Sequence, residues 1–143
     1  MTQEQKDLLF KDLCGRLPYG VKLHCYSNAM VCIGPYTLDT IVLDRIFNED
    51  TEYVPFDEVK PYLFPLSSMS EEQCYDFYCR FVENEIDYDD FKKYYFDEGR
   101  WHKLLTSIND CSRVIDWFHK NHFDYRGLIP KGSAIDATDK NIY

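Results

Sequence analysis

Apolar side chains recur at helical spacing near the start of the chain, over residues 2–15, at Leu8, Leu9, Leu13 and Cys14. This spacing predicts a helix with one side facing a core. Thr2 is the predicted N-cap, with Gln5 as its capping-box partner. Gly15 stands where the helix is expected to end, and the residues LPYG, 17–20, predict a turn.

From residue 20 the pattern changes to the alternation of a strand in VKLHCYS, 21–27. The next β-rich runs are AMVCIG (29–34), YTLDTIVLDRIF (36–47) and TEYVPF (51–56), and FDEVKPYLFPL (56–66) ends as a strand. About five short strands with tight connections predict a small SH3-like antiparallel β-barrel or curved sheet.

Helical spacing returns in the second half of the chain. Ser70 and Gln73 form a capping-box pattern, and a stripe follows at Cys74, Phe77, Tyr78 and Phe81. A second helix is expected from Asp87 or Asp89 to Gly99, and a third in WHKLLTSI, 101–108. The last helix is expected after a cap at Asn109 or Asp110, with an apolar face at Cys111, Val114, Ile115 and Phe118.

The predicted fold class is therefore α+β. Residues 1–66 are expected to form the N-terminal helix and the small barrel, and residues 67–143 a region of three to four helices packed on it. With 143 residues and 17 % aromatic side chains, the chain can bury a core without disulfides or metal.

The net charge of −9 changes the range of expected partners. Residues 71–98 hold ten acids and three bases. Such a chain repels nucleic-acid phosphates, so a protein partner, basic in character, is favoured over nucleic acid. The alternative of a small barrel that binds RNA or DNA stays open, because residues 99–143 hold seven bases against five acids.

The cysteines and the N-terminus predict a cytoplasmic protein. The first residues are polar, and no apolar run approaches the ~20 residues that cross a bilayer, so no membrane association is expected. Six cysteines are expected to be reduced and buried in the core, as in cytosolic proteins.

Three segments resemble short proteins encoded by Bacteroides-type gut bacteria and their phages: RLPYGVKL (16–23), VKPYLFPLSSMSEEQ (59–73) and IDWFHKNHFDYRGLIPKGSAIDAT (115–138). The resemblance implies an accessory protein carried on phage or other mobile DNA. It implies no activity, cofactor or catalytic residue.

Metal and thiol chemistry have weak signals. His119 and His122 are spaced to share a zinc ion, with Asp124 close behind and His102 or Cys111 as a third ligand. The alternative is a solvated His119 and a His122 that caps helix carbonyls as a cation. No cysteine has a histidine nearby in the sequence that is placed to activate it as a nucleophile. No cofactor and no catalysis are therefore predicted, and a small metal- or thiol-dependent enzyme remains the alternative.

The acidic stretch ENEIDYDDFKKYYFDE, 83–98, has two interpretations. In the first, its acids are solvated and its apolar side chains are buried: Ile86, Tyr88, Phe91, Tyr94 and Tyr95. In the second, it is an exposed binding surface for a basic protein, with Tyr88, Asp89 and Asp90 as candidate contacts. The second interpretation supports the overall hypothesis of a non-catalytic protein that acts by protein–protein contact.

The run NHFDYRGLIPKG, 121–132, holds the densest group of chemically able side chains. Tyr125 and Arg126, with Asp124, are candidate binding residues, because an arginine fork and a tyrosine ring can hold a planar anion. The alternative is architectural. In it, Phe123, Tyr125, Leu128 and Ile129 dock the chain, and Asp124 and Arg126 pair or cap the nearby backbone around a turn at Gly127.

Overall fold

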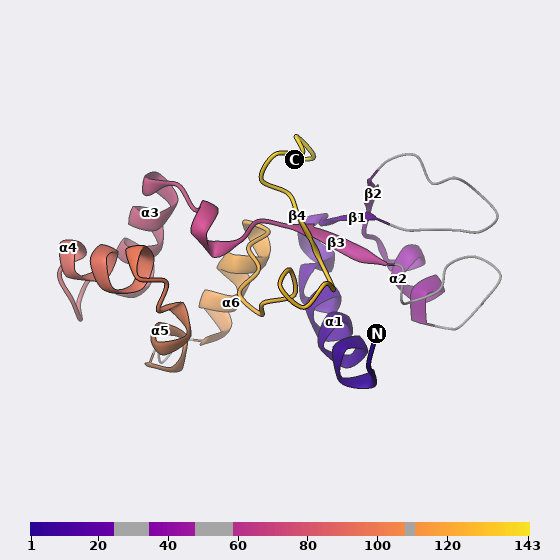
Figure 1. The fold of residues 1–143 in the computed structure, drawn as a ribbon, viewed down its shortest axis with the longest axis horizontal. Coiled ribbons are helices and arrows are strands. Elements are labelled where there is room, and N and C mark those ends of the chain that lie inside the picture. The colour runs from indigo at the N-terminus through magenta and orange to yellow at the C-terminus, as the bar shows by residue number, and fades with distance from the viewer. Residues whose placement is uncertain (25–34, 48–58, 108–110) are drawn as a thin grey trace.

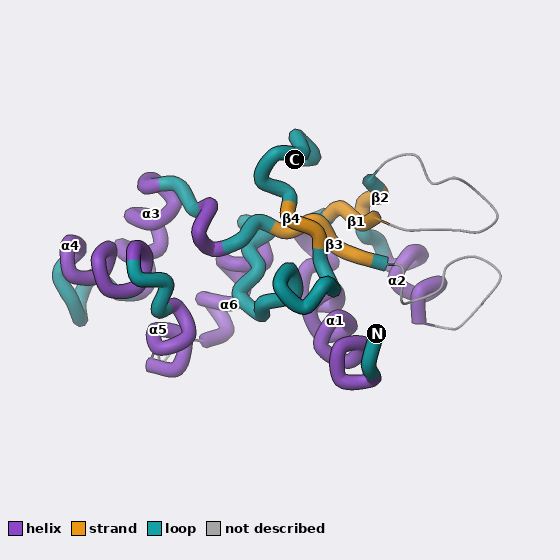
Figure 2. The backbone as a smooth tube through the Cα atoms, viewed as in Figure 1, coloured by secondary structure: helices purple, strands orange, loops and turns teal. Residues whose placement is uncertain are grey.

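The structure is a computed structural model that describes residues 1–24, 35–47, 59–107 and 111–143, apart from the side chains of Ile41, Arg45, Ile46, Phe47, Ser107 and Cys111. It confirms a mixed α+β fold (Figures 1 and 2). Helices α3, α4 and α5 lie at one end of the molecule and α2 lies at the other, with α1, α6 and the sheet between them.

Helix α1, Gln3–Arg16, begins as predicted. The Thr2 side chain accepts from the Gln5 amide, and the Gln5 side chain accepts from the Thr2 amide at 2.8 Å, which completes a capping box. Gly15 does not end the helix, contrary to the prediction. Instead the chain continues into a 3-10 turn, η1 (Leu17–Tyr19), and reverses at Gly20, whose φ of 64° suits glycine.

The sheet has four short strands in the order β2-β1-β3-β4, formed by Tyr36–Thr37, Lys22–His24, Lys60–Leu63 and Ile135–Asp136. The first three are antiparallel neighbours, whereas β4 pairs with β3 in parallel. The predicted antiparallel barrel is therefore wrong: within the described residues the sheet is mixed and not closed. Its last strand comes from the C-terminal tail and not from the first half of the chain.

The run 36–47 is a second correction. Only Tyr36 and Thr37 are a strand, and Thr40–Phe47 form helix α2. The Asp39 carboxylate accepts from the Val42 amide at 2.7 Å at the start of this helix, and this local bond outweighs the strand preference of the β-branched residues. The strands predicted at 29–34 and 51–56 lie outside the described residues.

The C-terminal helices agree with the prediction of three to four. After a 3-10 turn, η3 (Leu66–Ser68), they are α3 (Glu71–Phe81), α4 (Tyr88–Phe91) with its π-helical continuation η4 (Lys92–Asp97), α5 (Trp101–Ser107) and α6 (Cys111–Lys120). Ser70 and Gln73 form the predicted capping box, and Asp87 is the N-cap of α4. The predicted caps Asn109 and Asp110 lie outside the described residues.

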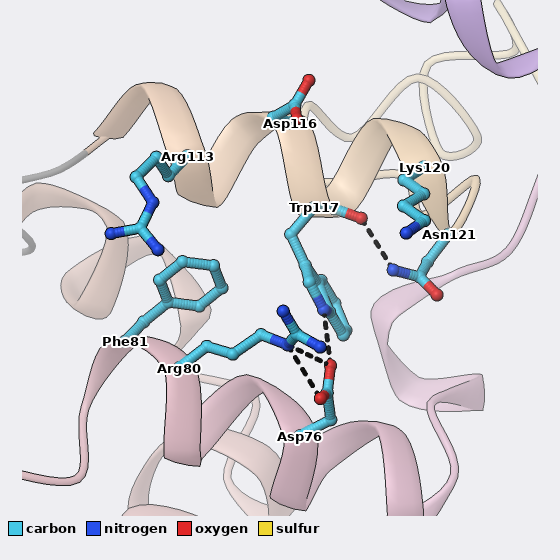
Figure 3. A pocket seen from close by; sticks show the side chains of 8 residues that line it. All are labelled: Asp76, Arg80, Phe81, Arg113, Asp116, Trp117, Lys120 and Asn121. Carbon is cyan, nitrogen blue, oxygen red and sulfur yellow. Dashed lines mark hydrogen bonds and ion pairs between the residues drawn. The ribbon is translucent and has the colours of Figure 1, made fainter.

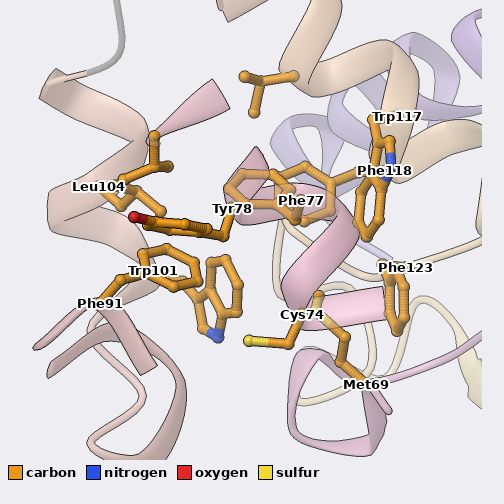
Figure 4. Packing of buried hydrophobic residues seen from close by; sticks show 12 residues of the cluster. Met69, Cys74, Phe77, Tyr78, Phe91, Trp101, Leu104, Trp117, Phe118 and Phe123 are labelled. Carbon is orange, nitrogen blue, oxygen red and sulfur yellow. The ribbon is translucent and has the colours of Figure 1, made fainter. Parts of the chain in front are cut away.

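Two clusters of buried side chains hold these elements. The first lies between α1 and the sheet and contains Leu9, Leu13, Val21, Leu23, Leu38, Val59, Leu63, Leu128 and Ala134. The second is largely aromatic and joins α3, α4, α5 and α6 (Figure 4). Phe77 is its centre, because its ring centroid lies within 5.5 Å of those of Trp101, Trp117 and Phe118.

Gly15 of α1 lies directly against His119 of α6. A Cβ atom added there would lie 2.2 Å from Cε1 of His119, whose ring is buried and cannot swing away. The glycine therefore permits the contact between the two helices.

Gly15→Ala is expected to lower the free energy of unfolding by about 1–3 kcal/mol, measured by urea denaturation, because it overpacks this contact. In an open helix interior the same change would stabilise by up to about 1 kcal/mol. Cys14→Ala, at the exposed neighbouring position, is the control and should change little. A stabilised Gly15→Ala variant would show that the two helices do not touch there.

Candidate functional site

The run 121–132 starts where α6 ends. His122 has a φ of 58°, which reverses the chain after the helix. The Phe64 amide then donates to the His122 carbonyl at 2.9 Å, and the Asp124 amide donates to the Phe64 carbonyl at 2.8 Å. These bonds form an isolated parallel bridge between Phe64 and Phe123, which holds the run against the end of β3.

The Asp124 carboxylate is used inside the fold. It is 7 % exposed and accepts from the amides of Leu128 and Ile129, each at 2.8 Å. Gly127, with a φ of 68°, allows the turn that brings these amides to it. This geometry is the backbone capping that the architectural alternative expects.

Arg126 belongs to a buried ionic network with α1. Its Nε lies 3.3 Å from Oδ1 of Asp12, a fully buried carboxylate that also accepts from Arg16 Nε at 2.6 Å. Arg16 is itself fully buried and donates from Nη2 to the Phe123 carbonyl at 2.7 Å. Asp12 therefore joins the two arginines, and Arg16 joins α1 to the run.

Tyr125 completes this region through His119. The Tyr125 hydroxyl and His119 Nε2 are 3.0 Å apart, and the Tyr125 ring stacks on Phe118 at 5.4 Å. Burial lowers the pKa of His119 to about 4, with a further contribution from the Arg16 charge, and burial raises the pKa of Tyr125 to about 12. Both groups are therefore neutral at pH 7 and share one neutral hydrogen bond.

A cavity of about 560 Å³ lies beside this turn. Its walls are mainly apolar and include Leu66, Phe96, Trp101, Leu105 and Tyr125. Asp124 also lines it, but with its carboxylate already engaged, and Arg126 does not line it. The Arg126 guanidinium lies 4.8 Å from the centre of the Tyr125 ring, but of these two residues only Tyr125 lines the cavity. A binding role for these residues stays a prediction.

The two histidines of the metal hypothesis have different surroundings in the structure. His119 was expected to be solvated and is instead buried, at 5 % exposed. The His122 ring stacks on Tyr143 at 4.1 Å, and burial lowers its pKa to about 4, so it is not the helix-capping cation that the sequence suggested. Among the described residues, no three His, Cys, Asp or Glu side chains are grouped to hold a metal ion.

The cysteines differ partly from the expectation. In the described side chains Cys14, Cys74 and Cys79 are free thiols, and only Cys74 is in the core. Cys14 and Cys79 are exposed, so the prediction that the cysteines are core residues is wrong for these two. The other three cysteine side chains lie outside the description.

The acidic stretch combines both interpretations. Phe91 is fully buried, Ile86, Tyr88 and Tyr95 are half-buried, and Tyr94 is 46 % exposed, contrary to the first interpretation. Asp89 and Asp90 are exposed in the first turn of α4. The Tyr88 ring meets that of Tyr75, which is 53 % exposed, edge-on at 5.1 Å.

The buried pair Asp12 and Arg16 was missed by the sequence reasoning. A signal was present, because residues 9, 12, 13 and 16 lie on one helical face, and an acid and a base four positions apart on a helix can pair. Their charges suggested the solvated side, whereas the pairing allows both to be buried.

Comparison of the chain with protein-family models, with curated proteins and with solved structures gave no match. The resemblance to proteins of gut bacteria and phages therefore stays a prediction. Within the described residues, no helix has the length and apolar character that crossing a membrane requires.

The neutral His119 predicts a loss of stability in mild acid. Its folded pKa of about 4 lies below the ordinary value of 6.5, so between these pH values the unfolded chain binds more protons than the folded one. The free energy of unfolding should therefore fall as the pH drops from about 6.5 to about 4, by up to about 3 kcal/mol for this residue.

Urea denaturation at pH 7.5 and pH 4.5 measures this dependence. His119→Gln should lose part of it, whereas His102→Gln, at an exposed position on α5, should keep it. An identical pH dependence in His119→Gln and the wild type would contradict a buried neutral His119.

Proposed function

We propose that the protein is a non-catalytic accessory protein that binds a basic protein partner through its acidic face. The acidic face is defined here as Glu83, Glu85, Asp87, Asp89 and Asp90 together with the rings of Tyr75 and Tyr88. The resemblance to phage and mobile-element proteins supports an accessory role, and no feature of the described residues calls for catalysis to explain it.

The strongest support for this proposal comes from two exposed carboxylates, Glu83 and Glu85. Glu83 and Glu85 are exposed, and within the described part of the chain neither makes an ion pair. Asp87, Asp89 and Asp90 have a local role at the start of α4, where negative charge is favoured. Glu83 and Glu85 lie before the helix and lack that role, so their mutual repulsion is not offset within the fold.

Of the rings beside these acids, Tyr75 is exposed, and it contacts neighbouring tyrosines. Tyr75 contacts Tyr88 at 5.1 Å and Tyr78 at 6.3 Å, and the Tyr78 hydroxyl donates to the Ile86 carbonyl at 2.9 Å. The pKa of Tyr78 is raised, first by burial and then by the charges of Asp87 and Glu83. A partner would find Tyr75 already fixed, with little entropy left to lose.

The carboxylates and the tyrosine rings would have different roles in such an interface. Unpaired carboxylates speed the encounter with a basic partner and reject acidic ones, and a tyrosine at the contact supplies much of the affinity. Tyr94 is a weaker candidate, because the Arg100 guanidinium already lies 4.5 Å over its ring.

The nucleic-acid alternative rested in part on a barrel, and the sheet of the described residues is not closed into one. Nucleic-acid binding itself stays untested.

The proposal is tested with Lys- and Arg-rich peptides selected against the wild-type protein from a displayed library. Affinity is then measured by fluorescence anisotropy. Glu83→Gln/Glu85→Gln is expected to weaken binding about tenfold, and Tyr75→Ala to weaken it by a similar factor, since each removes one part of the contact.

Glu4→Gln/Asp139→Asn is the matched control, because it removes two exposed acids and has the same net charge as Glu83→Gln/Glu85→Gln. It should bind like the wild type. Equal weakening of peptide binding in both double variants would show that only the overall charge matters, and would contradict a specific acidic face. Turnover of a substrate that depends on a single side chain would overturn the non-catalytic proposal.

A further inference from the structure

A groove between α3 and α6 gathers positive charge in an acidic protein. It encloses about 280 Å³ and is lined by Arg80 and Asp76 from α3, Arg113, Trp117 and Lys120 from α6, and Phe81 at the end of α3, with Asp116 and Asn121 at its edge. Figure 3 shows the Arg80 and Arg113 guanidinium groups between the two helices.

Both carboxylates of the groove are engaged. Asp76 accepts from Trp117 Nε1 at 2.9 Å and from Arg80 Nε at 2.8 Å. Burial alone would raise the pKa of Asp76, but these donors and the charges of Arg80 and Lys120 lower it. Asp116 accepts from the Tyr19 hydroxyl and points away from α3 (Figure 3).

The cations therefore outnumber the carboxylates, three to two, around one small space. Lys120 is exposed, and within the described residues its amine makes no hydrogen bond or ion pair. A dianion fits this charge pattern better than a single carboxylate would, and a phosphate monoester carries about −1.5 to −2 at pH 7.

Two aromatic side chains, Trp117 and Phe81, form an apolar part of an otherwise polar groove. The Trp117 ring stacks on Phe123 at 5.8 Å and meets Phe77 edge-on at 5.1 Å, so it rests on the aromatic core. Phe81 is half-buried beside it. The volume suits a phosphate with a small organic group, since pockets for drug-sized ligands measure about 300–1,000 Å³.

We propose that the groove between α3 and α6 binds a small phosphate monoester, with Arg113 and Lys120 holding the phosphate and Phe81 and Trp117 contacting the organic group. Arg80 has a positioning role, because its pairing with Asp76 neutralises the floor of the groove. This site is independent of the acidic face, which uses Tyr75 and the loop after α3.

The test uses phenyl phosphate as the probe and the two indole N–H resonances of the ¹⁵N-labelled protein as the readout. The Trp117 resonance should shift and saturate with a Kd below about 1 mM, whereas the Trp101 resonance should stay in place. Benzoate should bind at least about fivefold more weakly, and phenol should not saturate, because each has less charge or none.

Lys120→Gln and Arg113→Gln should each weaken phenyl phosphate at least about fivefold. Lys11→Gln, an exposed lysine of α1, is the matched control and should bind like the wild type. Lys120→Gln keeps the test valid if Arg113→Gln fails to fold, since Lys120 is exposed and makes no bond that the fold requires.

Three results would overturn the proposal. They are no saturable shift of the Trp117 resonance up to about 10 mM phenyl phosphate, unchanged affinity in Lys120→Gln, and phenol binding as tightly as phenyl phosphate.

Discussion

The fold depends on a fully buried ion pair between Asp12 and Arg16, one turn apart on α1. Removing both charges from water costs several kcal/mol for each ion, and the cost is offset only when the remaining donors and acceptors find partners. Here Arg126 Nε lies 3.3 Å from Asp12 as an ion pair, and Arg16 Nη2 donates to the Phe123 carbonyl. The offset is incomplete, because Arg16 Nη1 and Arg126 Nε make no hydrogen bond among the described residues. The pair fixes the C-terminal run to the first helix and joins the two clusters of buried side chains, since Phe123 belongs to the aromatic one.

This constraint decides what the chain can offer to other molecules. Asp124 caps the turn, Arg126 joins the network, and Tyr125 bonds to a neutral His119. The side chains that make the run 121–132 look chemically able are thus engaged inside the fold. Within the described residues, the charges that make no ion pair lie elsewhere, as Glu83 and Glu85 after α3 and as Lys120 in the groove between α3 and α6. One protein can therefore present surfaces of opposite sign on two sides of one helix.

Local rules predicted the parts of the fold that depend on neighbours in sequence. The capping boxes at Thr2 and Ser70 are such features, as each needs only residues three positions apart. Strand β4 could not be predicted, because two residues of the tail pair with β3 through contacts distant in sequence. The same holds for the groove, whose cations come from separate helices. Asp12 and Arg16 were within reach of the sequence, since their spacing already placed both on the buried face of α1.

Amide hydrogen exchange in an Arg16→Lys variant tests most directly whether α1 holds the run. Lysine keeps the charge but lacks the fork that reaches both Asp12 and the Phe123 carbonyl. The amides of residues 123–128 should then exchange at least about tenfold faster than in the wild type, while those of α3 keep their protection. Unchanged exchange across residues 123–128 would show that α1 does not hold the run in place. Tyr125 and Arg126 would then again be candidates for binding a ligand.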